Sequence, residues 1–254
     1  MGKLYVVGLG PGGQQYMSEK ARAAVEEADV VIGYTTYIAL VRDLFSEKEY
    51  VQTPMRTERE RCMQAIERAG QGQCVALVCS GDAGIYGMAA PLLELLAAGK
   101  TDGVEVEIVP GITAAVMAAS VLGAPLMNDF CIISLSDLLT PAAVIRKRLA
   151  AAAAGDFVIC LYNPRSHTRT KPLDDALAIL RSLLSPDTVV GIVRNAGRDG
   201  QSQWIGTLET VEPEQVDMFC VMIVGNSATR VLDGRMVTAR GYEKTGGEKG
   251  YGRP

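Results

Sequence analysis

One local pattern occurs three times in the first half of this chain, and it constrains the fold more than any other feature. In each case a short apolar run is followed by a turn rich in glycine and then by the start of a helix. The turns are residues 8–13, 80–87 and 109–114. Short apolar runs that alternate with helices predict a parallel sheet with helices packed on it. In such folds the turns at the carboxyl ends of the strands are a usual position for a ligand.

The rest of the chain continues the alternation of strands and helices. Ser18 is expected to cap a helix that ends at Ala28, and Thr57 with Glu60 forms the pattern of a capping box for a helix that ends at Gly70. Further helices are expected at residues 86–98, 113–122, 142–154 and 172–184, and strands at 3–7, 29–32, 74–79, 104–108, 130–134, 157–162, 188–194 and 218–224.

Two successive α/β blocks predict two domains, residues 1–123 and 141–240, each a sheet flanked by helices, with a cleft between them. Residues 124–140 hold Pro125, a strand-like run and a polar turn, and are expected to connect the two domains. Residues 241–254 are rich in Gly, Lys and Glu, so we expect a disordered tail.

Composition and charge exclude several classes of protein. The formal net charge is -4, so the molecule as a whole does not attract nucleic acid, and an anionic partner needs a local basic patch. No apolar run reaches the roughly 18 residues of a membrane span, and the chain enters a strand without a signal peptide, which predicts a cytoplasmic protein. The six cysteines form no CxxC pair and lie mostly in apolar runs, which predicts free thiols and no structural metal.

The first turn also fits the G-x-G-x-x-G pattern of dinucleotide-binding folds. Pro11 lies inside it and has no N–H to offer a pyrophosphate. The acid that should end the second strand is missing, because Asp29 begins that strand. An NAD site is therefore disfavoured. The other two turns also have purely structural explanations, in which Asp82 and Thr113 cap the helices that follow.

Taken together, the three turns resemble those of the tetrapyrrole methylase family, which carries a GxGPG loop, a GD-containing loop after a middle strand and a PG-x-[ST]-[AS] turn. Leu161-Tyr162-Asn163-Pro164 and Val193-Arg194-Asn195-Ala196-Gly197 add to the resemblance, which covers residues 3–240. The family implies a two-domain α/β fold in which each domain is a mixed sheet flanked by helices. It also implies transfer of a methyl group from S-adenosylmethionine to a tetrapyrrole, with S-adenosylhomocysteine as the by-product.

Within the family, residues 80–89, 128–141 and 162–166 are similar to the branch that methylates C(17) and contracts the ring on the way to cobalamin. Other branches have proline after the acid of the middle turn, where this chain has Ala83, and the uroporphyrinogen-type members have Asp where it has Gly33-Tyr34-Thr35. The similarity implies precorrin-3B as substrate, precorrin-4 as product and a homodimer. A cobalt-bearing analogue, cobalt-factor III, and methylation of another carbon stay open as alternatives.

The resemblance places the methyl donor against small and polar residues. The implied donor-binding residues are Gly10, Pro11, Ser80, Gly81, Asp82, Ile85, Thr113, Ala114, Asn163 and Ala196. Catalysis at such a site is mostly orientation, with the methyl carbon held about 3–3.5 Å from its acceptor. That step needs neither a metal nor a redox cofactor.

A tetrapyrrole carries many carboxylates, which arginine binds well. Residues 146–148 form a basic cluster that we expect to be a solvated helix face, whereas Arg56 and Arg165 lie in loops and are candidates for binding the substrate. Ring contraction also needs a group that accepts a hydroxyl proton. The candidates are Tyr34, Ser134, Ser136 and Asp137. The single histidine, His167, lies in a polar loop, which argues against a Ser-His-Asp triad.

Two other classes of function are alternatives. An NAD-dependent oxidoreductase would be protected against unfolding by NAD rather than by adenosylmethionine. A non-catalytic sensor would bind the tetrapyrrole or the donor without transferring a methyl group.

Overall fold

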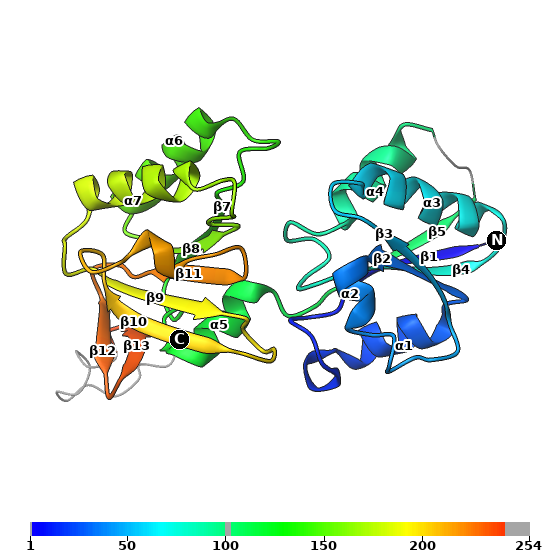
Figure 1. Ribbon diagram of the computed structural model, residues 1–254, viewed down its shortest axis with the longest axis horizontal. Coiled ribbons are helices and arrows are strands. Elements are labelled where there is room, and N and C mark those ends of the chain that lie inside the picture. Colours follow the sequence, from blue (N-terminus) through cyan, green and yellow to red (C-terminus); the bar gives the residue numbers. More distant parts are fainter. Residues whose placement is uncertain (1, 100–102, 242–254) are drawn as a thin grey trace, which may run out of the picture. The chain divides into compact units, whose positions relative to one another are not determined.

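The computed structural model describes residues 2–99 and 103–241, and the chain forms two compact units, Met1–Ala114 and Ala115–Pro254. Both units are α/β, as the sequence predicts (Figure 1). The division falls before the expected linker, and residues 124–140 are not a separate connection, because the strand Phe130–Ser134 pairs with the sheet of the second unit. The expected disordered tail lies outside the described residues, apart from Gly241.

The first unit is built on a five-stranded sheet in the order β3-β2-β4-β1-β5. Its strands are β1 (Lys3–Gly8), β2 (Val30–Tyr34), β3 (Glu49–Thr53), β4 (Cys74–Cys79) and β5 (Glu105–Val109). Every pairing in it is parallel, so this sheet is not mixed, in contrast to what the resemblance implies. Parallel pairing brings the carboxyl ends of all its strands, and with them the three glycine-rich turns, to one edge.

Helices cover both faces of this sheet (Figure 1). α1 (Glu19–Glu27) and α2 (Thr35–Ala39) lie on one face, α3 (Glu58–Gly70) and α4 (Ala89–Ala97) lie on the other, and a short 3-10 helix, η1 (Gln14–Tyr16), precedes α1. The side chains of successive residues of β1 point to opposite faces of the sheet. Tyr5 and Val7 join the cluster under α1, whereas Leu4 and Val6 join the cluster under α3 and α4.

Two helix starts differ from the sequence prediction, and one agrees with it. Ser18 caps α1, its Oγ accepting from the N–H of Ala21 at 3.1 Å. Thr57 forms no capping box, because its hydroxyl donates instead to the carbonyl of Pro54 at 2.8 Å. α4 begins at Ala89 rather than at Tyr86, because Tyr86 has a φ of 54°, outside the right-handed helical region.

The second unit is built on a mixed five-stranded sheet in the order β10-β9-β11-β8-β7, in agreement with the prediction. The strands are β7 (Phe130–Ser134), β8 (Val158–Tyr162), β9 (Val189–Arg194), β10 (Ser202–Thr207) and β11 (Cys220–Val224). Strands β7 and β8 are parallel, and the other pairings are antiparallel. A smaller sheet contains β12 (Thr229–Leu232), β13 (Arg235–Thr238) and β6 (Gly123–Ala124).

Both faces of the larger sheet are covered. α6 (Ala142–Ala154) and α7 (Lys171–Leu183) bury Leu149 and Leu177 against one face, and η2 (Pro213–Gln215) precedes β11. On the other face Leu122 of α5 (Ala114–Leu122) lies over Gly191, where an added Cβ would be 2.5 Å from the Leu122 side chain. In the described part of the chain the longest helices have 13 residues, and none is long and apolar enough to cross a bilayer.

All six cysteines carry free thiols, as predicted. Burial raises the pKa of Cys160 to about 12 and those of Cys62, Cys79 and Cys220 to about 11. A raised pKa keeps a thiol protonated at neutral pH, and the protonated form is unreactive. We therefore expect iodoacetamide at pH 8 to label these four thiols in the unfolded chain but only very slowly in the native protein, as read by peptide mass spectrometry. Rapid native labelling of Cys160 would contradict the described core.

Candidate active site

The first two glycine-rich turns are joined through their backbones at the carboxyl edge of the first sheet. The N–H of Gly10 donates to the carbonyl of Gly81 at 3.0 Å, and the N–H of Gly81 donates to the carbonyl of Gly10 at 2.7 Å. The Ser80 hydroxyl also donates to the Gly10 carbonyl at 3.4 Å. A Cβ added to Gly111 in the third turn would lie 2.2 Å from the Gly81 oxygen and 2.5 Å from the Gly8 oxygen. The three turns therefore touch each other, and at Gly111 only glycine fits between them.

The carboxylate of Asp82 holds these turns in place. Its Oδ1 accepts from the N–H of Gly84 at 2.8 Å and of Ile85 at 3.1 Å, and its Oδ2 accepts from the N–H of Gly111 at 3.0 Å. Asp82 therefore does not cap α4, for which no side chain serves as a cap. It closes its own turn and links it to the third turn, a contact that could not be recognised from sequence spacing.

Space remains beside Gly81. A Cβ added there would meet nothing closer than the Thr113 Cα at 3.8 Å and the Ala114 N at 3.9 Å. Three apolar side chains of the same turns are exposed to solvent: Ile85 by 36%, Tyr86 by 57% and Ile112 by 37%. An open, apolar space bordered by backbone suits a flat ring. Sequence reasoning did not select Tyr86 or Ile112, although their positions inside the glycine-rich turns were a usable signal.

Eight of the ten predicted donor-binding residues lie in these turns of the first unit. Gly10, Ser80, Gly81 and Asp82 are connected by the hydrogen bonds described above, and the buried Pro11 follows Gly10 directly. The structure thus gathers all eight at one sheet edge. The remaining two, Asn163 and Ala196, belong to the second unit.

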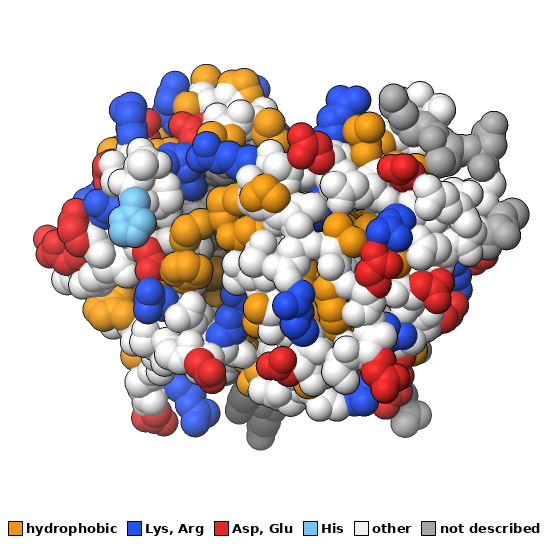
Figure 2. Space-filling model, turned by 45° about the vertical axis from the view of Figure 1, so that its right-hand side comes forward, with side chains coloured by type: hydrophobic (Ala, Val, Ile, Leu, Met, Phe, Trp, Pro, Cys, Tyr) orange, Lys and Arg blue, Asp and Glu red, His pale blue; other side chains and the backbone are white. Residues whose placement is uncertain are grey.

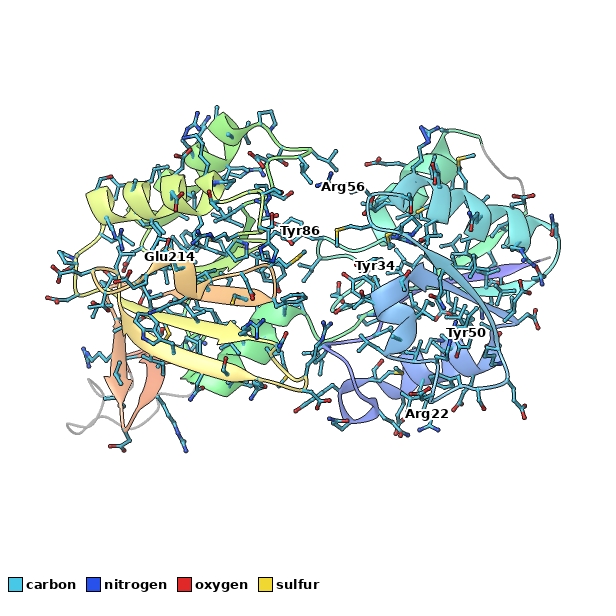
Figure 3. The ribbon with its side chains drawn as sticks, in the orientation of Figure 1. Arg22, Tyr34, Tyr50, Arg56, Tyr86 and Glu214 are labelled. Atoms are coloured by element: carbon cyan, nitrogen blue, oxygen red, sulfur yellow. The ribbon has the colours of Figure 1, made fainter. Side chains whose placement is uncertain are left out.

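Tyr34 and Arg56 also lie at the carboxyl edge of the first sheet, as does Tyr86 (Figure 3). Tyr34 ends β2, and its ring meets Tyr37 edge-on at 5.2 Å between centroids. Arg56 follows β3 and is exposed, with a φ of 67°.

The neighbouring Arg61 has a different, structural role. It is only 3% exposed, its Nε donates to the Thr53 hydroxyl at 2.5 Å and its Nη2 donates to the Pro54 carbonyl at 2.9 Å. Its Nη1 lies 3.6 Å from the sulfur of Met88. Arg61 therefore fixes the end of β3 and contacts Met88 directly before α4, and it is not available to a substrate.

In the second unit, Ser134 and Tyr162 face each other at the paired carboxyl ends of β7 and β8. The Asn163 side chain, directly after β8, donates through Nδ2 to the Ser134 hydroxyl oxygen at 3.0 Å. The N–H of Ser136 donates to the same oxygen at 3.2 Å. The structure thus joins Asn163, which was predicted to bind the methyl donor, to Ser134 and Ser136, two of the proposed proton acceptors. The Tyr162 hydroxyl accepts from the N–H of Ala115 at 2.5 Å, at the start of α5.

Asp137 lies apart from this group of hydrogen bonds. It is exposed and lines a small cavity of about 70 Å³ with residues of α6 and α7, among them Arg146 and Lys171. Of the candidates Ser134, Ser136 and Asp137, the structure therefore brings the two serines to Asn163.

Ala196 follows β9, whose carboxyl end is at the same sheet edge as that of β8, because both strands pair antiparallel to β11. Its neighbour Asn195 has a φ of 50°, and the N–H of Asn195 donates to the Phe219 carbonyl at 3.1 Å. The side chain of Arg194 donates to Asp217 at 2.9 Å, and this contact raises the pKa of Arg194. The start of the loop that contains Ala196 is thus fixed by one backbone contact, to Phe219, and one side-chain contact, to Asp217.

Arg165 is partly buried, with 20% of its side chain exposed, and it pairs with the exposed Glu214 at 3.4 Å. Figure 3 shows Glu214 in the second unit. His167, visible in pale blue in Figure 2, is on the surface, in agreement with the expectation of a solvated histidine.

Comparison with known proteins gives a consistent result over nearly the whole chain. A family model described as Tetrapyrrole (Corrin/Porphyrin) Methylases matches residues 3–212. A probable cobalt-factor III C(17)-methyltransferase of Salmonella typhimurium is 52% identical over 239 residues, covering 94% of this chain and 99% of that protein. A cobalt-factor III methyltransferase of Priestia megaterium is 44% identical, and the match covers 96% of this chain but only 46% of that longer protein. A precorrin-3B C(17)-methyltransferase of a Sinorhizobium species is 38% identical, covering 91% and 92%.

Solved structures share the fold. The crystal structure of the methyltransferase CobJ superposes with a TM-score of 0.89 at 38% identity, covering 94% of this chain and 100% of that one. A cobalt precorrin-4 methyltransferase superposes with a TM-score of 0.68 at 25% identity, covering 88% of this chain and 94% of that one. The likeness therefore includes both units of the chain.

Proposed function

Because the chain belongs to the tetrapyrrole (corrin/porphyrin) methylase family, we propose that it is an S-adenosylmethionine-dependent enzyme that methylates C(17) of a cobalamin precursor and contracts its ring. The observation that carries this proposal is the 52% identity, over 94% of the chain, to a relative named for C(17) methylation. The three turns of the first unit support it, since they hold eight of the ten residues implied to bind the donor and contact one another through their backbones.

The turns of the first unit fit the donor. S-adenosylmethionine, when bound, supplies an electrophilic methyl group on its sulfonium sulfur. A space borders Gly81, Thr113 and Ala114. A Cβ added at Gly81 would have no other atom closer than 3.8 Å. Ile85 and Tyr86 expose apolar surface that suits a purine. Asp82 contributes by fixing the turns through three backbone N–H groups.

We propose a cobalt-bearing substrate ahead of the metal-free precorrin-3B that the sequence resemblance first implied. Four relatives named for cobalt-factor III are 40–52% identical to this chain, whereas the precorrin-3B relative is 38% identical. In either case the cobalt ion belongs to the substrate and not to the protein. We also propose that the enzyme acts as a homodimer in the cytoplasm. Light scattering of the purified protein tests whether it is a dimer.

Proton transfer during ring contraction is proposed to use a group near C(17). The hydroxyl oxygen of Ser134 receives two N–H donors, from Asn163 and Ser136, which engages both of its lone pairs. Ser134 is therefore a weaker candidate for accepting a proton than Tyr34, Ser136 or Asp137. Replacing the residue that accepts the proton should slow turnover and leave the affinity for the methyl donor unchanged.

Arg56 and Arg165 are proposed to bind carboxylates of the macrocycle. At low salt, Arg56→Met and Arg165→Met are each expected to weaken tetrapyrrole binding about tenfold, a change of about 1.4 kcal/mol, with little effect on the donor. The loss should shrink at high salt, because screening already weakens exposed charge contacts. Glu214→Gln, which removes the carboxylate now paired with Arg165, should act in the opposite direction.

Absorbance titration with the tetrapyrrole measures these affinities. Arg22→Met is the matched control, because Arg22 lies on α1 with 47% of its side chain exposed and pairs with a carboxylate, that of Glu26, at 2.7 Å. Wild-type affinity in both the Arg56 and the Arg165 variant at low salt would show that the two arginines are merely solvated.

The function itself is tested with methyl-labelled S-adenosylmethionine and purified acceptors. Incubation with cobalt-factor III should give a product with one added labelled methyl group, seen by mass spectrometry, together with a change in the absorbance of the macrocycle. Precorrin-3B is the second acceptor, and uroporphyrinogen III is the control that should gain no label. Protection against unfolding by NAD rather than by S-adenosylhomocysteine would favour the oxidoreductase alternative instead.

A further inference from the structure

Arg169 joins the ends of two strands in the second unit. Its Nη1 donates to the carbonyl of Leu135, just after β7, at 2.9 Å. Its Nη2 donates to the carbonyl of Asn163, just after β8, at 2.8 Å. One planar guanidinium therefore spans the loop that holds the donor-binding candidate Asn163 and the loop that holds Ser134 and Ser136.

The position of Arg169 is fixed by its own backbone. The N–H of Ser166 donates to the Arg169 carbonyl at 3.0 Å, and the N–H of Arg169 donates to the Ser166 carbonyl at 3.2 Å. Arg146, Arg165, Lys171 and Arg194 of this unit pair with carboxylates. The guanidinium of Arg169 instead donates to two carbonyl oxygens.

Asn163 is the residue that this bridge holds. Its φ of 51° lies in the left-handed region, which asparagine adopts more readily than other residues with a side chain. Its side chain is held by Ser134 and its carbonyl by Arg169, so both of its polar ends are tied to neighbouring groups. Without the Arg169 contact, the backbone of this residue would lose the one partner that the structure gives its carbonyl.

We propose that Arg169 is a positioning residue for the methyl donor: by bridging the Leu135 and Asn163 carbonyls it holds Asn163 in the conformation that meets the donor. This inference rests on the proposed function, in which Asn163 contacts S-adenosylmethionine. It differs from the substrate-binding role proposed for Arg165, because the predicted effect is on the donor and not on the tetrapyrrole.

The test is Arg169→Lys, with S-adenosylhomocysteine binding measured by calorimetry in the absence of tetrapyrrole. The ammonium group of lysine cannot form the same two hydrogen bonds from one planar group, so we expect the affinity for S-adenosylhomocysteine to fall about tenfold. Arg181→Lys is the matched control: Arg181 also bridges two carbonyls, those of Leu208 at 3.1 Å and Val211 at 2.8 Å, but it lies at the end of α7. It should lose a similar amount of stability and no donor affinity.

A second variant, Arg169→Ala, tests the same claim by rescue. Added methylguanidinium should restore part of its donor affinity, and methylammonium should not. Unchanged donor binding in Arg169→Lys, an equal loss in Arg181→Lys, or a loss confined to tetrapyrrole binding would each overturn the inference. Failure of the wild-type protein to bind S-adenosylhomocysteine would instead overturn the proposed function, so the two failures are distinguishable.

Discussion

Replacing Gly111 by alanine is expected to destabilise the protein by at least about 3 kcal/mol, the upper end of the usual cost of an inserted methyl group. The new Cβ would lie 2.2 Å from the Gly81 oxygen and 2.5 Å from the Gly8 oxygen. Both are backbone atoms, so no side chain can rotate away to make room. The same change should displace the N–H that donates to Asp82, and with it the junction of the three turns.

Urea denaturation followed by circular dichroism measures this loss. Gly84→Ala is the control, because Gly84 belongs to the middle turn and an added Cβ there would meet only Asp82 Oδ1, at 3.4 Å. That variant should unfold close to the wild-type midpoint. If Gly111→Ala is as stable as Gly84→Ala, the close contact of the three turns is wrong.

Gly81→Val is expected to abolish donor binding and leave the fold intact. Its Cβ would find no protein atom closer than 3.8 Å, so the substitution fills the space assigned to the donor instead of the core. The φ of 70° adds a strain of about 1–2 kcal/mol for a residue with a side chain. The expected loss of S-adenosylhomocysteine affinity is at least about a hundredfold, or about 2.7 kcal/mol.

The strain at a positive φ has its own control. Gly72 has a φ of 92° and nothing within 4 Å of an added Cβ, and it lies in the turn between α3 and β4. Gly72→Val should therefore carry a similar backbone cost while binding the donor like wild type. Equal donor affinity in folded Gly81→Val and Gly72→Val would show that the donor does not occupy the space beside Gly81.

The elements that could be predicted from the sequence are those with a strong local signal. β4 is apolar throughout and lies between a polar turn and a glycine-rich one, and its predicted bounds agree with the structure. The strand β3 was not predicted, because its sequence EYVQT is short and mostly polar, and it forms only because β2 offers a parallel edge. Residues 130–134 were expected to lie in a linker for a related reason: whether β7 is a linker or an edge strand depends on its pairing with β8.

The candidate site shows the same limit. The glycine-rich turns could be recognised from residue types and spacing, since each follows a strand. Their mutual contacts could not, because Asp82 reaches Gly111 across a separation of 29 residues. Arg61 is buried although it lies in a run of charged residues, and nothing in such a run reveals which side chain points inward. The role of Arg169 could not be predicted either, because its bridge between two loops depends on the pairing of β7 and β8.

The central claim is that this one chain couples methylation of C(17) to contraction of the macrocycle. The most direct measurement is carbon-13 NMR of the product formed from cobalt-factor III and S-adenosylmethionine labelled in its methyl group. We expect a single enriched methyl signal, attached to C(17) of a ring that has lost one bridging carbon from its perimeter. A labelled methyl group at any other carbon, or at C(17) of a ring of unchanged size, would contradict it.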